Sequence, residues 1–308
     1  MKKIILDVDT GIDDALAIAY ATKSKDLDVL GLTTTFGNVQ VKDATRNTQF
    51  ILQMLEKDIP VYEGSDRPLN QQEPYLAVAQ KVHGNDGLAN KLEAYDVVTE
   101  EKQTGEAISF IIDTVKKYPN EVTLIFVGPL TNLAKVYEQA PEVATLVKEI
   151  IVMGGAVTVP GNVRSHAEAN IFSDPEAAKR VLQSDLPITL VGLDVTMQTL
   201  LSRDEVKRWE KTDSEASKFF ANITNYYIDF YESFRPGIGG CGLHDPLAIG
   251  RAIDPTFVQT RAMNVDVHLD EALRGNTFET EKATKNTSDC LEVDVQRFLD
   301  HFVQTINF

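Results

Sequence analysis

The sequence is poor in cysteine, has far fewer basic than acidic residues and lacks long apolar runs. Its two cysteines, Cys241 and Cys290, are too few to indicate a disulfide framework. The formal net charge is −16 at pH 7 and Lys and Arg do not cluster, which argues against binding to nucleic acid or anionic membranes. No apolar run approaches the length of a membrane span, and the stretch between Lys3 and Asp7 is too short for a signal peptide. We therefore expect a cytoplasmic protein.

The chain also lacks a Pro-, Ser- or Gly-rich linker, so we expect a single domain over residues 1–308. Apolar runs rich in β-branched residues predict buried strands at 4–6, 29–35, 122–127, 149–153 and 188–191. Helical spacing predicts helices at 13–23, 43–56, 105–117, 132–138 and 174–182, the last with Asp174 as its cap and Pro175 as its first residue. This alternation predicts a Rossmann-like α/β fold, with a mostly parallel central sheet flanked by helices.

Four carboxylates stand together directly after the first apolar run, in Asp7-Val8-Asp9-Thr10-Gly11-Ile12-Asp13-Asp14. Like charges this close repel one another, so such a cluster indicates a bound cation or catalytic chemistry. The cluster lies between a strand and a helix, and this end of a parallel strand is where α/β sheets bind ligands. An EF-hand is excluded because a strand precedes the cluster and Ile18 stands at the twelfth loop position. Stabilisation of a helix N-terminus would explain Asp13 and Asp14 alone.

The opening is similar to the nucleophile motif of haloacid-dehalogenase-type phosphatases, strand then Asp-x-Asp-x-Thr/Val, although Gly11 stands at the last position. It also resembles the signature of the nucleoside hydrolases, Asp-x-Asp-x-Gly-x-Asp-Asp, at every position. This second resemblance continues in the family's order through Thr34-Thr35-Phe36-Gly37-Asn38-Val39, His83-Gly84-Asn85-Asp86-Gly87-Leu88, Val127-Gly128-Pro129-Leu130-Thr131-Asn132, Met153-Gly154-Gly155, Gly161-Asn162, Ala167-Glu168-Ala169-Asn170 and His244-Asp245-Pro246. These blocks span nearly the whole chain.

The resemblance to nucleoside hydrolases implies hydrolysis of the N-glycosidic bond of ribonucleosides to free base and ribose. It implies a Ca²⁺ ion, which suits hard oxygen ligands, held by Asp9, Asp14, the backbone carbonyl of Val127 and Asp245. Asp9 would accept the proton of the attacking water. The resemblance assigns ribose recognition to Asp13, Asn38, Met153, Asn162, Glu168 and Asn170, and assistance to the leaving base to His244 and His83. It also leads us to expect a homodimer or homotetramer.

Other interpretations of these residues stay open at this point. An Asn after Gly, as in Gly37-Asn38, is commonly a turn residue, and Met153 at the end of an apolar strand is commonly core. Asp7 is as well explained by a structural role as by support of the metal site. The chain as a whole would alternatively be a phosphatase with Asp7 as nucleophile and Mg²⁺ as cofactor, or a noncatalytic protein that binds a nucleoside or ribose.

Two segments do not follow the strand and helix pattern. Residues 69–90 are polar and punctuated by glycine, and residues 214–242 are rich in aromatic residues and end in Pro236-Gly237-Ile238-Gly239-Gly240. Both are candidate lids over a site. We expect most of the aromatic side chains of 226–234 to be core, with some contacting the base. Near the C-terminus, the polar segment 279–289 replaces a Gly-Arg-Pro-Pro-like turn common in the family, which leaves the oligomer contacts there open.

Overall fold

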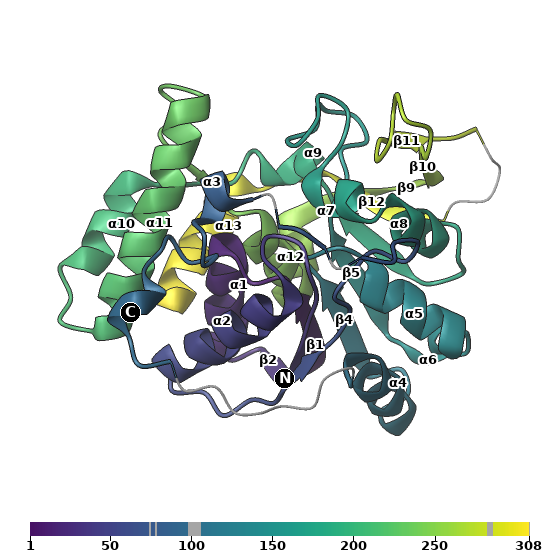
Figure 1. Ribbon diagram of the computed structural model, residues 1–308, viewed down its shortest axis with the longest axis horizontal. Coiled ribbons are helices and arrows are strands. Elements are labelled where there is room, and N and C mark those ends of the chain that lie inside the picture. Colours follow the sequence, from purple (N-terminus) through teal and green to yellow (C-terminus); the bar gives the residue numbers. More distant parts are fainter. Residues whose placement is uncertain (74, 78, 98–105, 282–285, 308) are drawn as a thin grey trace.

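A computed structural model describes residues 1–73, 75–77, 79–97, 106–281 and 286–307. Its centre is an eight-stranded sheet in the order β3-β2-β1-β4-β5-β6-β12-β9 (Figure 1). Neighbouring strands are parallel except β12 and β9, which are antiparallel. The predicted α/β fold with a mostly parallel sheet is therefore confirmed. The strands are β1 (Lys2–Val8), β2 (Leu27–Thr34), β3 (Val61–Glu63), β4 (Val122–Phe126), β5 (Glu149–Met153), β6 (Ile188–Val191), β9 (Val258–Met263) and β12 (Thr287–Val293).

The five predicted strands are confirmed as β1, β2, β4, β5 and β6, with ends that differ by at most two residues. The sequence did not indicate β3, β9 and β12, and a different physical reason explains each omission. β3 has three residues, and the four central residues of β9 are exposed because this strand forms one edge of the sheet. β12 mixes buried and half-buried residues with an exposed one, since it closes the parallel part of the sheet rather than lying at its centre.

Helices cover both faces of the sheet and bury two separate cores (Figure 1). Successive side chains of β1 point to opposite faces, so that Ile4 and Leu6 pack in one core and Ile5 packs in the other. The first core is closed by α1 (Ile12–Lys23), α2 (Val41–Met54), α11 (Glu215–Phe234), α12 (His244–Ile253) and α13 (Val295–Ile306). The second is closed by α4 (Ala107–Lys117), α5 (Thr131–Gln139), α6 (Val143–Leu146) and α8 (Pro175–Leu182).

The predicted helices are confirmed with small changes at their ends. The predicted start of the helix at Gly105 lies outside the described residues, and α4 begins at Ala107. Asp174 caps α8 as predicted, since its Oδ1 accepts the Ala177 N–H at 3.0 Å and Pro175 is the first helical residue. Within the described residues, no helix combines the length and the apolar character that a bilayer span requires.

The two candidate lid segments have different structures. Residues 214–242 contain one long helix, α11, whose end protrudes beside the upper edge of the molecule in Figure 1, and then β8 (Gly240–Gly242). Residues 69–90 contain the one-turn helix α3 (Gln80–His83), which contacts α11. The segment 279–289 begins with the last residue of β11 (Thr277–Glu279), which pairs with β10 (Val265–Val267), and ends within β12, while 282–285 lies outside the described residues. That the two lids move stays a prediction.

Candidate active site

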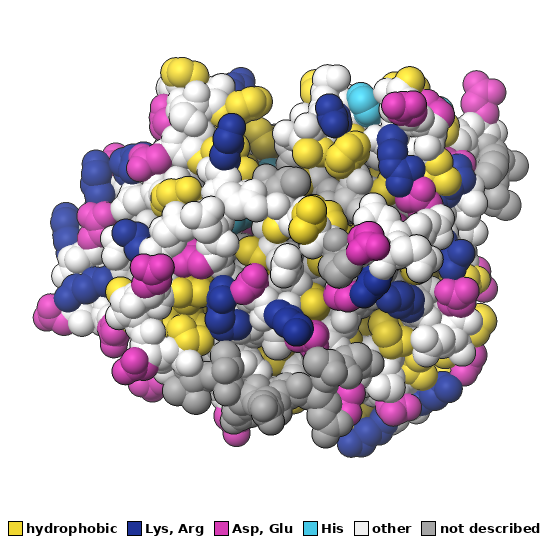
Figure 2. Space-filling model, in the orientation of Figure 1, with side chains coloured by type: hydrophobic (Ala, Val, Ile, Leu, Met, Phe, Trp, Pro, Cys, Tyr) yellow, Lys and Arg dark blue, Asp and Glu magenta, His cyan; other side chains and the backbone are white. Residues whose placement is uncertain are grey.

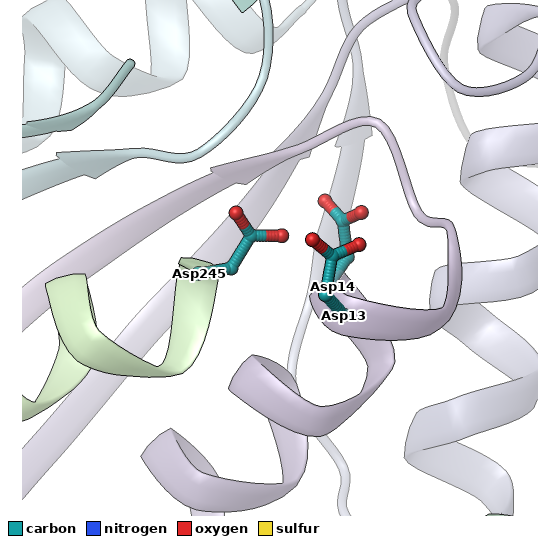
Figure 3. Close-up of side chains that lie close together, drawn as sticks. All are labelled: Asp13, Asp14 and Asp245. Carbon is teal, nitrogen blue, oxygen red and sulfur yellow. The ribbon is translucent and has the colours of Figure 1, made fainter. Parts of the chain in front are cut away.

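Three buried carboxylates converge at the carboxyl end of the sheet. Asp13 and Asp14 lie in the first turn of α1, and Asp245 lies in the first turn of α12, with its carboxylate turned toward the other two (Figure 3). One oxygen of each side chain lies within 4.8 Å of an oxygen of the others, and none of the three is more than 7% exposed. The packing of α1 against α12 therefore brings together acids that are far apart in the sequence.

Asp9 joins this group from the end of β1. Its backbone N–H donates to Asp14 Oδ1 at 3.1 Å, and its Oδ2 accepts the Asn38 N–H at 2.6 Å. The Asn38 amide also donates from Nδ2 to Asp14 Oδ2 at 3.0 Å, so one turn after β2 orients both carboxylates. A Cβ on Gly37 would lie 2.0 Å from Asp9 Oδ2, which explains why glycine precedes Asn38.

Burial and mutual repulsion raise the pKa values of these acids. Burial raises the pKa of Asp9 and of Asp245 well above the ordinary range, and the neighbouring acids raise both further. The pKa of Asp13 rises to about 8, mainly through burial and then through Asp14. The pKa of Asp14 is also raised by burial, although backbone N–H donors from Gly11 and Asp9 oppose the shift. A cation at this position would favour the ionised form of all four acids.

The donor set fits a hard divalent cation. Asp9 Oδ1 and Asp13 Oδ1 are buried and have no hydrogen-bond partner among the described residues. The Val127 carbonyl follows β4 and accepts a hydrogen bond from Asn170 Nδ2 at 2.7 Å, which leaves its second lone pair available. All of these donors are oxygen atoms, the ligands that Ca²⁺ and Mg²⁺ prefer. The residues predicted as ligands therefore offer oxygens at one edge of the sheet.

Asp7 lies within β1, two residues before Asp9, and makes different contacts. Its Oδ2 accepts hydrogen bonds from Thr33 Oγ1 at 2.5 Å and Asn132 Nδ2 at 2.7 Å, while its Oδ1 is buried without a partner among the described residues. Its backbone carbonyl accepts the Val127 N–H at 3.0 Å. Burial raises the pKa of Asp7 to about 7. Asp7 therefore connects β1, β2, β4 and α5, and its side chain is fully buried.

Three of the residues predicted to bind ribose, Met153, Glu168 and Asn170, lie around α7 (Ala169–Ser173). Glu168 caps this helix, and its carboxylate accepts N–H groups of Gly155, Asn170 and Ile171 at 2.9–3.1 Å. Asn170 Nδ2 contacts Val127 O as above and Met153 O at 3.2 Å. Glu168 also contributes to the raised pKa of Asp245, which places its charge near the acidic group.

Asn162 is the predicted site residue with the weakest connection to the carboxylates. Its side chain is exposed, and its Oδ1 accepts the Ala169 N–H at 3.0 Å. It thus lies at the start of α7 rather than among the buried acids. The remaining predicted residues that the structure gathers at this edge are Asp9, Asp13, Asp14, Asn38, Val127, Met153, Glu168, Asn170 and Asp245.

Two histidines, His83 and His244, are buried near the acids. His83 Nδ1 accepts the N–H of Ile12, the first residue of α1, at 3.1 Å. His244 is hydrogen-bonded at Nε2 to Tyr231 Oη at 2.6 Å and at Nδ1 to Thr196 Oγ1 at 2.8 Å. Burial lowers the pKa of His83 to about 3, with a further contribution from His244, and burial lowers the pKa of His244 to about 4. Both rings are therefore neutral near pH 7.

Sequence reasoning missed the polar contacts of α11 and α9 (Leu193–Thr196). Tyr227 donates from its hydroxyl to Asp13 Oδ2 at 3.4 Å, and its ring lies 5.5 Å from that of His83. Tyr231, one turn later, reaches His244. The spacing of four residues places both on one helix face and was the available signal. Nothing in the sequence pointed to Thr196.

The molecular surface is hollowed at this edge, between the protruding end of α11 and the lobe that carries α9 (Figure 2). Acidic and basic side chains are interspersed over the face that the figure shows, without a continuous basic patch. A small polar ligand could thus approach the buried acids and the two histidines from one side.

Comparison with known proteins identifies the family. A sequence model of the inosine-uridine preferring nucleoside hydrolases matches residues 4–300. The pyrimidine-specific ribonucleoside hydrolase RihB of Escherichia coli (strain K12) is 36% identical over 269 residues, which cover 87% of this chain and 83% of that protein. A purine-preferring ribonucleoside hydrolase from Gardnerella vaginalis superposes with a TM-score of 0.93 at 38% identity, covering 99% of this chain and 98% of the other. A plant nucleoside hydrolase superposes with a TM-score of 0.92 at 33% identity, with the same coverage. The chain therefore belongs to the nucleoside hydrolase family, whose members are enzymes that cleave N-glycosyl bonds.

Proposed function

We propose that the protein hydrolyses ribonucleosides to free base and ribose with the help of a bound Ca²⁺ ion. The observation that carries this proposal is the convergence of buried carboxylates, two with unpartnered oxygens, beside two neutral histidines. The ligands would be Asp9, Asp14, Asp245 and the carbonyl of Val127. When bound, the ion supplies a site that orients the attacking water and lowers its pKa.

Asp9 is the proposed proton acceptor. Its Oδ2 is held by the Asn38 N–H at 2.6 Å, whereas its Oδ1 has no partner among the described residues and can hold the proton taken from water. A Cβ on Gly128 would lie 2.9 Å from this Oδ1, so the backbone approaches Asp9 closely on that side.

Ribose recognition is proposed for Asp13, Asn38, Met153, Asn162, Glu168 and Asn170. Glu168 and Asn170 support the proposal through position, since both lie where α7 meets the carbonyl of Val127. The carboxylate of Glu168 already accepts three backbone N–H groups, so its remaining lone pairs are those available to a sugar hydroxyl. His244 and His83 are proposed to assist departure of the base, because His244 directly precedes Asp245 and His83 contacts the Ile12 N–H beside Asp13.

The phosphatase alternative loses its support. Asp7, its nucleophile, is fully buried, and its Oδ2 is occupied by hydrogen bonds from Thr33 and Asn132. The alternative of a noncatalytic nucleoside-binding protein makes a different prediction from ours, namely binding without base release. We further propose that residues 1–308 form one catalytic domain that works in the cytoplasm as a homodimer or homotetramer, which light scattering after gel filtration would test.

The decisive experiment is release of free base from a panel of purine and pyrimidine nucleosides, with and without chelator. Both base classes are needed because RihB is named pyrimidine-specific and the Gardnerella enzyme purine-preferring. We expect calcium-dependent release from ribonucleosides and poor turnover of 2′-deoxynucleosides, since each unpaired buried polar group costs about 1–3 kcal/mol. Binding of nucleosides without release, or full activity after exhaustive chelation, would contradict the proposal.

A further inference from the structure

The turn that follows His83 has an unusual backbone. Four of its residues have positive φ angles: Gly84 at 82°, Gly87 at 84°, Ala89 at 61° and Asn90 at 58°. The left-handed conformation is unfavourable for a residue with a Cβ, and Ala89 has no polar side chain that would compensate. Such conformations persist where surrounding contacts enforce them, and they concentrate at functional sites. The contacts that hold Ala89 in the left-handed conformation therefore indicate what the turn does.

Asp86 makes most of these contacts. Its Oδ1 accepts the N–H groups of Leu88 and Asn90, each at 2.8 Å, and its Oδ2 accepts the Leu92 N–H at 3.1 Å. One carboxylate thus satisfies three backbone donors of the turn. The Ala89 N–H, in turn, donates to the carbonyl of His83 at 2.7 Å, which closes the turn against the histidine.

Asn47 joins this turn to the acidic loop. It is fully buried in α2, and its Nδ2 donates to the carbonyl of Asp86 at 2.8 Å and to the carbonyl of Thr10 at 3.0 Å. Thr10 lies between Asp9 and Asp13, and its hydroxyl is also hydrogen-bonded to that of Thr48 at 2.6 Å. The turn around Asp86 and the loop of catalytic acids are therefore held in one frame by α2.

The frame determines how His83 is presented. Because its Nδ1 accepts the Ile12 N–H, this nitrogen carries no proton, and the neutral ring must carry its proton on Nε2. A Cβ on Gly11 would lie 2.7 Å from Nδ1, so glycine is what allows the ring to approach the start of α1. The low pKa of His83 agrees with a ring that donates a hydrogen bond and stays neutral.

We propose that Asp86 is a positioning residue, which through the turn 84–92 holds His83 as an Nε2–H donor fixed toward the departing base. This inference rests on the proposed function, in which His83 serves the base side. It goes further in assigning a role to Asp86, which is partly exposed and contacts none of the site residues with its side chain.

The test is Asp86→Asn in the calcium-loaded full chain. The amide keeps one acceptor oxygen but turns an N–H₂ group toward a backbone N–H, so the turn loosens. We expect kcat/KM on a natural ribonucleoside to fall on the order of tenfold to a hundredfold, because small displacements of a catalytic group have effects of this size. Activity on a nitrophenyl riboside, whose phenolate leaves unaided, should change less than about threefold.

Two companion variants keep the result interpretable. Asn85→Ala, on an exposed side chain of the same turn, is the matched control and should behave like wild type. If Asp86→Asn folds poorly, it is combined with Ala89→Gly, which relieves the left-handed conformation at that position. Nitrogen NMR of ¹⁵N-histidine-labelled protein reports the protonation of both ring nitrogens directly, and the chain has only five histidines to assign. Wild type should show His83 with the proton on Nε2, and Asp86→Asn should broaden or shift that signal.

Wild-type kinetics in a folded Asp86→Asn variant would overturn the proposal. Equal losses of kcat/KM on the natural ribonucleoside and on the nitrophenyl riboside would also overturn it, because they would place the effect at the acids instead of at His83. An Nδ1–H tautomer in wild type would overturn it as well. If the wild-type enzyme releases no base from any ribonucleoside, the proposed function fails, and the NMR comparison alone then decides whether Asp86 positions His83.

Discussion

Removal of the metal should lower the thermal stability of the wild-type protein, whereas removal of one carboxylate ligand should raise the stability of the metal-free protein. Without a cation, Asp13, Asp14 and Asp245 hold their oxygens within 4.8 Å of one another in a buried site, which costs folding free energy. With Ca²⁺ at a hundred times its dissociation constant, the folded state gains about 2.7 kcal/mol. For 308 residues, the entropy of unfolding is roughly 0.65 kcal/mol/K. Calcium should therefore raise Tm by about 4 °C over the chelated protein.

Asp245→Asn removes one converging carboxylate at nearly constant volume. In chelator, where the wild-type acids repel one another, we expect this variant to be more stable than wild type by about 1–3 kcal/mol, which corresponds to roughly 2–5 °C in Tm. In calcium, the order should reverse, because the variant has lost a ligand and gains little from the ion. Scanning calorimetry of both proteins at pH 7, in chelator and in a calcium titration, measures all four states.

The matched control is Asp213→Asn. Asp213 is fully exposed, and its substitution changes the net charge by the same amount as Asp245→Asn. It should shift Tm by less than about 1 °C and keep the full response to calcium. A wild-type Tm that calcium leaves unmoved would refute the metal site. An Asp245→Asn variant less stable than wild type in chelator would refute the repulsion argument.

Three further predictions concern single side chains. Asp9→Asn should lower kcat by roughly 10²–10⁴-fold, the usual contribution of a general base, while circular dichroism stays unchanged, and wild-type turnover would exclude Asp9 as proton acceptor. His244→Ala should lose far more activity on a natural ribonucleoside than on a nitrophenyl riboside, and equal losses would assign this histidine to binding or structure. Burial raises the pKa of Asp289 to about 6, so the stability that its protonated form contributes is complete below about pH 4 and is lost as the pH rises through 6. Asp289→Asn should therefore stabilise the protein by about 1–3 kcal/mol at pH 8 and hardly at all at pH 4 in denaturant titrations, and a gain independent of pH would contradict this assignment.

The sequence by itself determined the class of fold and the centre of the site. Continuous apolar runs predicted the five central strands, because strands buried on both faces carry no polar alternation. The strand, turn and helix around Asp9 and Asp14 are local, so their spacing alone placed the acids at the ligand-binding edge of the sheet. The edge strands β3 and β9 were not predicted, since they are short or exposed and their residues do not stand out from loop residues.

Only the tertiary structure decided which distant residues meet these acids. The position of Asp245 beside Asp13 follows from the packing of α12 on α1, and the contact between His83 and Ile12 joins two residues that are far apart in the sequence. Thr196 lies on the short helix α9 and Asp86 lies in a turn, and neither belongs to a periodic pattern. Their hydrogen bonds depend on where separate strands and helices end in space. Secondary-structure propensity and apolar spacing do not predict where these ends lie relative to one another, because they report burial along one element and not the geometry between elements.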